Sequence, residues 1–149
     1  MSRGLAAAGD HDDAALAGAV GAYRSGDIDV AIAAADEVCT LIDGMPDPEL
    51  VRHLRAAAWL SWADLLLGHY RDVARRQSRA VELACTSGQL HVLPLLLNAH
   101  GSALRWLGRL DEAAGSLAEA AEIARSSGAT TQLTLALTGS CQVALLAGE

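Results

Sequence analysis

Apolar and polar positions follow a helical period through residues 95–128. Two amphipathic stretches of this segment flank the short turn LGRLDEA, which predicts two helices packed against each other. Small residues occupy the places where the two helices would touch, and large apolar residues fill the space between them. The small residues are Gly101, Ala113 and Ala120, and the large ones are Leu97, Leu104, Leu110 and Leu117.

The same layout recurs along the chain at a nearly constant interval. The first three predicted turns carry similar sequences, GDIDVA, GHYRDVA and GRLDEA. Self-similarity with a period of about 40 residues predicts a stacked array of helix pairs. The glycines of the predicted turns follow this period, at Gly26, Gly68, Gly108 and Gly148. The glycines that close the units recur at a similar interval, at Gly44, Gly88 and Gly128.

Helix start and stop signals divide the chain into about seven helices with no strand pattern. Asp47 can cap the third helix, with Pro48 at its first helical position. Pro94 either kinks the fifth helix or marks its true start. The expected helices cover residues 12–25, 27–43, 48–67, 70–86, 89–107, 110–126 and 130–147.

The same period predicts the domain organisation. We expect residues 1–10 to form a mobile tail and residues 11–149 to form one domain. The expected units are about 11–44, 45–88 and 89–128, followed by a half unit at 129–149.

The helix–turn–helix unit resembles a tetratricopeptide (TPR) repeat. Two features depart from the usual pattern: His100 stands where leucine is usual, and no proline closes the unit. The resemblance implies an all-α, right-handed superhelix, and the long period resembles the helical repeats of large LuxR-type (MalT-like) bacterial activators and of repeat-containing diguanylate cyclases. The positions that carry the resemblance are Leu97, Gly101, Gly108, Ala113, Leu117 and Ala120.

Composition narrows the class of protein. The 149 residues are 52% hydrophobic, which argues against disorder, and the net charge of −7 disfavours nucleic-acid binding. No signal peptide is recognisable, and threonine, serine and glutamine interrupt the uncharged run at 126–148, which argues against a membrane helix. We therefore expect a cytoplasmic protein whose cysteines, Cys39, Cys85 and Cys141, are buried free thiols.

No motif of a known catalytic type is present, so we expect no enzymatic activity and no cofactor. Cys85, His91 and His100 lack the short paired spacing of structural metal sites, so we expect no metal. Asp111 and Glu112 begin a predicted helix, where negative charge complements the helix N-terminus.

A basic stripe runs along the predicted helix at residues 70–86. It is either a docking surface for an acidic partner or a set of arginines paired with neighbouring helices, and we favour the second interpretation. The stripe consists of Arg71, Arg75 and Arg79, with Arg76 beside them, and its expected partners are Asp36, Glu37, Glu112 and Glu119.

The resemblance also implies a candidate binding groove, because the first helices of tetratricopeptide units line a concave face. Arginine and asparagine beside tryptophan and tyrosine suit a bound peptide. Trp62 fits a groove or a core position equally well, whereas Trp106 fits a core position better. The candidate groove residues are Tyr23, Arg24, Arg55, Trp62, Asn98, Ser102, Arg105 and Gln142.

The last predicted helix is apolar on more than one side and carries no charged residue, unlike the polar terminal helix of an ordinary array. We expect it to be covered, either by further repeats or by a second copy. Leu133, Leu137 and Leu145 would then mediate self-association as a two-fold dimer.

These patterns predict a non-catalytic module that binds a protein or peptide, as the sensory or scaffold part of a bacterial regulator. The alternative is a small-molecule sensor in which Arg55, Asn98 and Arg105 hold an anionic effector. An enzyme is the third and weakest alternative.

Overall fold

The computed structural model describes residues 28–148, and the chain divides into two compact units, Met1–Met45 and Pro46–Glu149. The described part of the first unit is one helix, α2 (Ile28–Gly44), as the pattern at 27–43 predicts. The predicted tail, the helix at 12–25 and the candidate groove residues Tyr23 and Arg24 lie outside the described residues.

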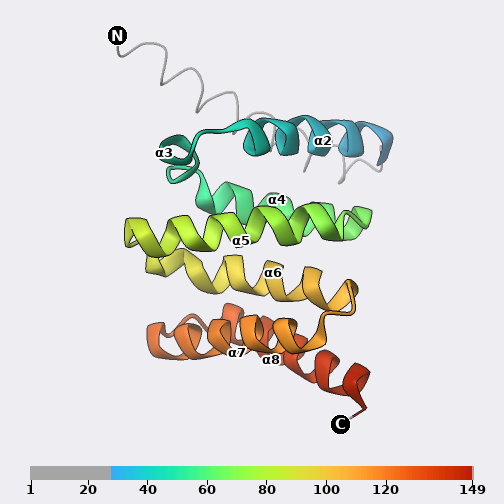
Figure 1. The fold of residues 1–149 in the computed structure, drawn as a ribbon, viewed down its shortest axis with the longest axis vertical. Helices are drawn as coiled ribbons and strands as arrows, with labels where there is room; N and C mark the ends of the chain where they lie inside the picture. Colours follow the sequence, from blue (N-terminus) through green and yellow to red (C-terminus); the bar gives the residue numbers. More distant parts are fainter. Residues whose placement is uncertain (1–27, 149) are drawn as a thin grey trace. The chain divides into compact units, whose positions relative to one another are not determined.

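Within the described residues, helices are the only regular secondary structure of the second unit, as Figure 1 shows. The all-α prediction is thus confirmed for residues 28–148, which contain no strand. None of these helices combines the length and hydropathy that a bilayer span requires. The elements are α3 (Asp47–Leu50), α4 (Leu54–Leu67), α5 (Tyr70–Ser87), the 3₁₀ turn η1 (Leu90–Val92), α6 (Leu93–Trp106), α7 (Leu110–Ser127) and α8 (Thr130–Ala147).

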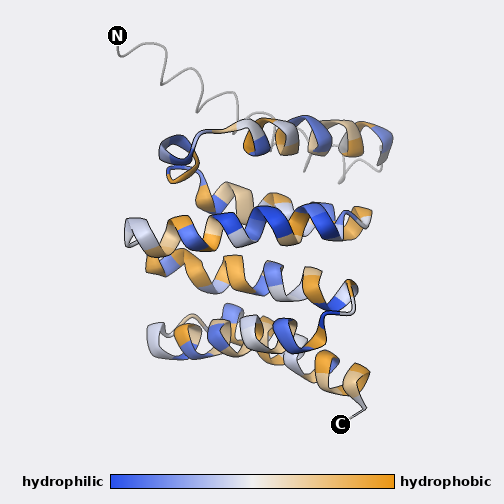
Figure 2. Ribbon diagram, in the orientation of Figure 1, coloured by the Kyte–Doolittle hydropathy of each residue, from blue (hydrophilic) through white to orange (hydrophobic). Residues whose placement is uncertain are grey.

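Each long helix of the second unit packs mainly on its neighbours along the chain. Helix α5 contacts α4 and α6, and α7 contacts α6 and α8. Helices α4, α6 and α8 also contact one another in that order, so α6 lies against four other helices. Figure 2 shows hydrophobic residues concentrated on α6 and α8 and hydrophilic residues concentrated on α5.

Glycines in the left-handed conformation end four of the helices and form the α6–α7 turn. Their φ angles lie between 72 and 84°, a region that other residues adopt only with strain. The residue after the glycine closes the helix end: the amide of His69 donates to the carbonyl of Asp64, and that of Arg109 donates to Leu104. These glycines are evenly spaced, at Gly68, Gly88, Gly108, Gly128 and Gly148.

The predicted helix at 48–67 is wrong in one respect, because the chain is not helical between α3 and α4. The apolar pattern could not reveal this break, since Leu50 and Leu54 are buried on either side of it at a spacing that a continuous helix would also have. The break frees the carbonyl of Val51, which accepts a hydrogen bond of 2.7 Å from the side chain of Gln89. Gln89, which follows α5, thus satisfies a backbone carbonyl in the break between α3 and α4.

The structure decides two expectations that involve prolines. Asp47 makes no capping hydrogen bond; its carboxylate instead accepts from Nε of Arg79 on α5 at 2.9 Å, so the predicted cap is wrong. Pro94 lies in the first turn of α6, just after η1, and therefore marks the true start of that helix. A proline costs no helical hydrogen bond at this position.

Leu117 of α7 occupies a notch formed by two glycines. A Cβ atom added at Gly101 of α6 would lie 2.7 Å from Cγ of Leu117, and one added at Gly139 of α8 would lie 3.0 Å from both of its methyl carbons. The lack of side chains at these glycines therefore lets Leu117 reach between α6 and α8. Ala113 and Ala120, the small positions expected at this contact, are buried.

The prediction for the cysteines is wrong at two of three positions. Cys39 is buried, whereas Cys85 and Cys141 are exposed. Cys85 lies in the last turn of α5, and Cys141 lies on a side of α8 that no described helix covers. Apolar sequence neighbours therefore do not ensure burial of a residue on a helix.

Candidate binding surface

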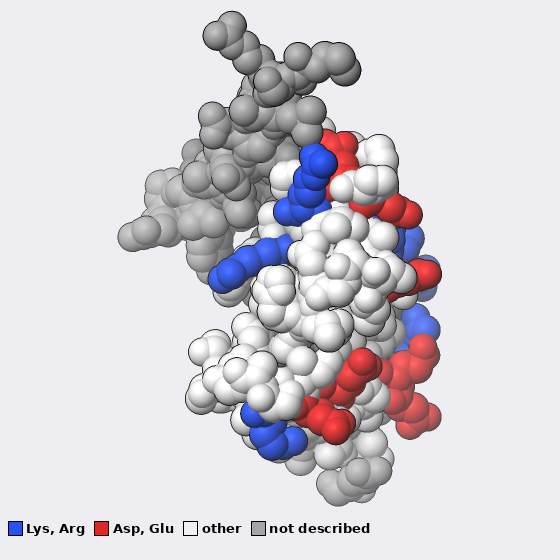
Figure 3. All heavy atoms as spheres, turned by 90° about the vertical axis from the view of Figure 1, so that its left-hand side faces the viewer, with Lys and Arg blue, Asp and Glu red and all other residues white. Residues whose placement is uncertain are grey.

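Charged residues are distributed unevenly among the helices of the second unit. Helices α4 and α6 contain only Arg55, Asp64 and Arg105 among them, and α8 contains none, whereas α5 and α7 are rich in charge. Figure 3 shows a broad uncharged area on one side of the molecule, with acidic side chains gathered toward one edge. The helices α4, α6 and α8 therefore offer an apolar surface with two arginines.

Helical spacing places several of the predicted groove residues on one accessible side of α4, α6 and α8, which we term the first-helix face. Residues 55, 62 and 66 lie on one side of α4, residues 102, 105 and 106 lie on one side of α6, and residues 142 and 146 lie on one side of α8. Leu66 is 77% exposed and Trp62 is half-buried. The face comprises Arg55, Trp62, Leu66, Ser102, Arg105, Trp106, Gln142 and Leu146.

An aromatic stack lies on this face where α6 ends and α5 begins. The rings of Tyr70 and Trp106 are stacked, with centroids 5.4 Å apart and an interplanar angle of 8°. The guanidinium carbon of Arg105 lies 4.8 Å from the centroid of Trp106. Trp106 is 56% exposed, so its predicted core position is wrong. Its ring stacks on Tyr70 of α5 and is otherwise open to solvent.

Tyr70 is a site residue that the sequence analysis missed. It follows the turn glycine Gly68 by two positions, as Leu110 follows Gly108, and both side chains pack against the same apolar core. The available signal is a large aromatic residue beside a turn, which by itself indicates only the start of a helix.

The two arginines of the first-helix face form no ion pair with the residues that the structure describes. Arg55 is exposed, and Arg105 is partly buried. Nε of Arg105 is buried and has no hydrogen-bond partner among the described residues. Both guanidinium groups therefore remain available to a carboxylate or a backbone carbonyl of a bound molecule.

Asn98 does not belong to the accessible face, so its predicted role in the groove is wrong. Its side chain is buried, and Nδ2 donates to both the backbone carbonyl and Oε1 of Gln132 at 3.0 Å each. The amide thereby joins α6 to α8. Of the other described groove residues, Ser102 is half-buried and Gln142 is exposed.

The arginine stripe on α5 is partly buried and has partners that the sequence did not predict. Arg75 lies 3.7 Å from Asp72 on the same helix. Arg79 lies 2.5 Å from Asp47 of α3. Arg76 is buried and is therefore not part of a surface stripe. Arg75, Arg76 and Arg79 are thus ion-paired, as the favoured interpretation predicts, but their partners Asp72, Asp64 and Asp47 are not among the residues it expected.

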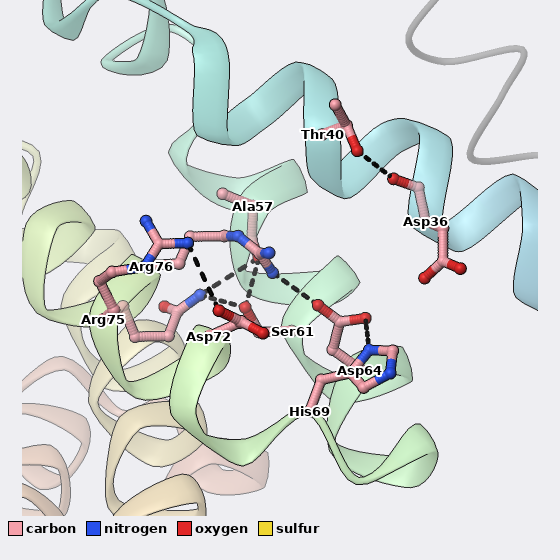
Figure 4. A network of polar contacts seen from close by, with 10 residues as sticks. Asp36, Thr40, Ala57, Ser61, Asp64, His69, Asp72, Arg75 and Arg76 are labelled. Atoms are coloured by element: carbon pink, nitrogen blue, oxygen red, sulfur yellow. Dashed lines mark hydrogen bonds and ion pairs between the residues drawn. The ribbon is translucent and has the colours of Figure 1, made fainter.

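A buried polar network between α4 and α5 is also absent from the sequence-based predictions (Figure 4). Nη1 of Arg76 donates to Oδ2 of Asp64 at 2.7 Å, and Nδ1 of His69 lies 3.3 Å from Oδ1 of the same carboxylate. Gln77 donates to Oγ of Ser61 and, at 3.2 Å, to the carbonyl of Ala57. A buried carboxylate and guanidinium at this distance satisfy each other, so the network fixes α5 against α4.

His100 of α6 packs against α7. Its Nδ1 lies 3.0 Å from Oγ of Ser116. Burial lowers the pKa of His100 below its ordinary value of 6.5; the positive charge of Arg109 lowers it further, and Glu112 acts in the opposite direction.

Stability should therefore decrease as the pH falls below about 6.5. The unfolded chain takes up a proton at His100 more readily than the folded chain does. The stabilisation that neutral His100 contributes is therefore complete above pH 6.5 and is lost as the pH falls through the lowered pKa of the folded state. The free energy of unfolding by urea, measured between about pH 8 and pH 5, should depend less steeply on pH in His100→Gln than in the wild type. The exposed control His91→Gln should keep the wild-type dependence. Equal slopes for the wild type and His100→Gln would contradict this assignment.

Comparisons with protein-family models, with curated proteins and with solved structures found no match to this chain. Within the described residues, no cluster of histidine, cysteine, aspartate or glutamate is arranged to hold a metal ion. The candidate site therefore consists of the first-helix face, with the Arg105–Trp106–Tyr70 stack as its most distinctive feature.

Proposed function

We propose that this chain is a tetratricopeptide-like helical-repeat module that binds an extended protein segment or peptide on the first-helix face. The stack of Arg105 and Tyr70 with the exposed Trp106 carries the proposal. Arginine, tryptophan and tyrosine are the residue types that dominate the binding energy of protein interfaces. The even spacing of the left-handed glycines from Gly68 to Gly148 supports the repeat assignment.

The chemistry of this face suits a peptide that has apolar side chains and at least one carboxylate. Trp62, Leu66 and Trp106 offer apolar area, while Arg55 and Arg105 offer donors that no described carboxylate occupies. The net charge of −7 disfavours a nucleic acid as the occupant. The proposed role is non-catalytic and cytoplasmic, as the sensory or scaffold part of a bacterial regulator.

The alternative of an anionic small-molecule effector is less well supported. It requires Arg55, Asn98 and Arg105 to converge on one ligand. Asn98 is buried, and its amide group is already bonded to Gln132 of α8. A peptide that lies across several helices does not require this residue.

Peptides selected from a phage-displayed random library on the full chain should test the proposal. Trp106→Ala should weaken a selected peptide by about 2 kcal/mol or more, roughly thirtyfold in affinity, because an exposed aromatic anchor is lost. Arg105→Ala should weaken peptides that contain a carboxylate. Calorimetric titration measures both effects, and thermal melts verify that each variant is folded.

Two matched controls lie outside this face. Leu90→Ala removes an apolar side chain of similar exposure, and Arg125→Ala removes an exposed arginine from the end of α7. Neither should change the affinity. Selected peptides that bind Trp106→Ala and Arg105→Ala as well as the wild type would place the binding surface elsewhere.

A further inference from the structure

Accessible charge on the first-helix face is entirely positive within the described residues. Helices α4, α6 and α8 contain only Arg55, Asp64 and Arg105 as charged residues, and Asp64 is buried in its ion pair with Arg76. The chain as a whole carries 18 acidic and 11 basic residues, so the charge of this face is opposite in sign to the net charge of the protein. Such a face attracts an acidic partner.

The two arginines lie at opposite ends of this face. Arg55 is in the first turn of α4 and Arg105 in the last turn of α6, and these two helices contact each other and run in the same direction (Figure 1). Tyr70 follows the end of α4 and stacks on Trp106, so the C-terminal ends of both helices lie together. Each helix has 14 residues, which places the two arginines about 15 Å apart along the helix axes. Because the guanidinium of Arg105 lies over the ring of Trp106, at the end away from Arg55, one carboxylate does not bridge both arginines.

Apolar side chains line the surface between the two arginines. Positions 55, 59, 62 and 66 follow the helical period, so they share one side of α4. Trp59 is 50% exposed and Leu66 is 77% exposed, and Trp62 is half-buried between them. A segment that reaches from Arg55 to Arg105 therefore passes over apolar surface.

We propose that the segment bound on the first-helix face carries two carboxylates, about four or six residues apart, with apolar side chains between them. One carboxylate pairs with Arg55 and the other with Arg105; this rests on the proposed function and adds the pattern of the ligand. An extended chain advances about 3.3 Å per residue, so about 15 Å corresponds to roughly five residues. Since successive side chains alternate in direction, an even spacing places both carboxylates on the side that faces the protein.

The two arginines should contribute unequally. Nε of Arg105 is buried without a hydrogen-bond partner among the described residues, and the guanidinium carbon lies 4.8 Å from the centroid of Trp106. This contact holds the guanidinium in place before a ligand arrives, so less freedom is lost on binding. Arg55 is exposed and loses more side-chain freedom when it pairs, so its contribution should be the smaller one.

A phage-displayed library of peptides with two glutamates placed at varied separations in randomised sequence, selected on the full chain, tests the spacing. Enriched peptides should carry their glutamates about four to six residues apart. Selection on Arg55→Ala or on Arg105→Ala should show no preferred spacing, because only one of the two arginines remains.

Calorimetric titration of one enriched peptide assigns each glutamate to an arginine. Arg105→Ala should weaken this peptide roughly tenfold, and Arg55→Ala should weaken it severalfold. The glutamate that pairs with Arg55 should be replaceable by glutamine without further loss in Arg55→Ala but not in the wild type, and the other glutamate should behave in the same way with Arg105→Ala. Arg125→Ala, which removes an exposed arginine outside this face, should leave the affinity unchanged.

Two results would overturn this proposal and leave the proposed function standing. In both, Trp106→Ala weakens the enriched peptides, but either their glutamates show no preferred spacing or Arg55→Ala is coupled to neither glutamate. Peptides that bind Trp106→Ala as well as the wild type, or a library that yields no binder, would overturn the proposed function together with this proposal.

Discussion

Replacing Asp64 with alanine should lower the free energy of unfolding by about 3–5 kcal/mol. Asp64 is 1% exposed and its ion-pair partner Arg76 is 3% exposed, so the substitution removes the carboxylate that pairs with a buried guanidinium. Water cannot replace the lost interaction at this depth. Urea unfolding of the full chain, monitored by far-ultraviolet circular dichroism, measures the loss.

Asp72 provides the matched control, because it also pairs with an arginine of α5 but is mostly exposed to solvent. Asp72→Ala should change the stability by less than about 1 kcal/mol, as exposed ion pairs contribute little. Asp64→Asn should fall between the two, since an amide retains a hydrogen-bond acceptor for Arg76 but not the charge. Similar losses in Asp64→Ala and Asp72→Ala would show that the buried ion pair stabilises the fold no more than the exposed one.

Replacing Leu117 with alanine should cost about 2–5 kcal/mol, because it empties the notch between α6 and α8. Leu117 is one of the largest fully buried side chains. The loss should be partly reversed when Gly101→Ala and Gly139→Ala are added to this variant. The two new methyl groups would occupy space that Leu117 fills in the wild type.

Gly101→Ala should have the opposite effect, a loss of stability, when Leu117 is present. Gly101→Ala alone should then cost about 1–3 kcal/mol through overpacking. Gly115 is the control, since it is a helical glycine with open space around its Cβ position, and Gly115→Ala should stabilise the protein by roughly 0.5–1 kcal/mol. Additive effects of Leu117→Ala and Gly101→Ala would argue against a direct contact.

The helix ends of the second unit were largely predictable from the sequence. Glycine is the residue that most easily adopts the left-handed conformation that terminates a helix, and it stands at each predicted end from Gly68 onward. Small residues at the contacts of α6 with α7 were predictable for a similar reason. Close packing tolerates little else than glycine or alanine there.

The interpretation of single side chains was less successful. The sequence predicts Asn98 on an accessible surface and Trp106 in the core, and the structure reverses both. A helical period gives the direction in which a residue points but not which sides of the helix its neighbours cover. Trp106 is exposed although its ring stacks on Tyr70 of α5, whereas Asn98 is buried and bonded to Gln132 of α8.

The ion pair of Asp64 and Arg76 could not be found from spacing alone. The two residues lie 12 positions apart on different helices, on either side of the turn at Gly68. A sequence shows that α5 is rich in arginine, but which arginine faces the preceding helix depends on the rotation of α5 about its axis. That rotation is set by packing.

The packing order of α4–α8 has a consequence for how this unit folds. Each helix has its main contacts with elements one or two positions away along the chain. Few long loops must therefore be closed before contacts form, and low contact order of this kind favours rapid folding. Helix α6 contacts two helices before it and two after it along the chain, so we expect it to belong to the folding nucleus. We expect the α6–α7 pair to form first, with α5 and α8 added from opposite directions.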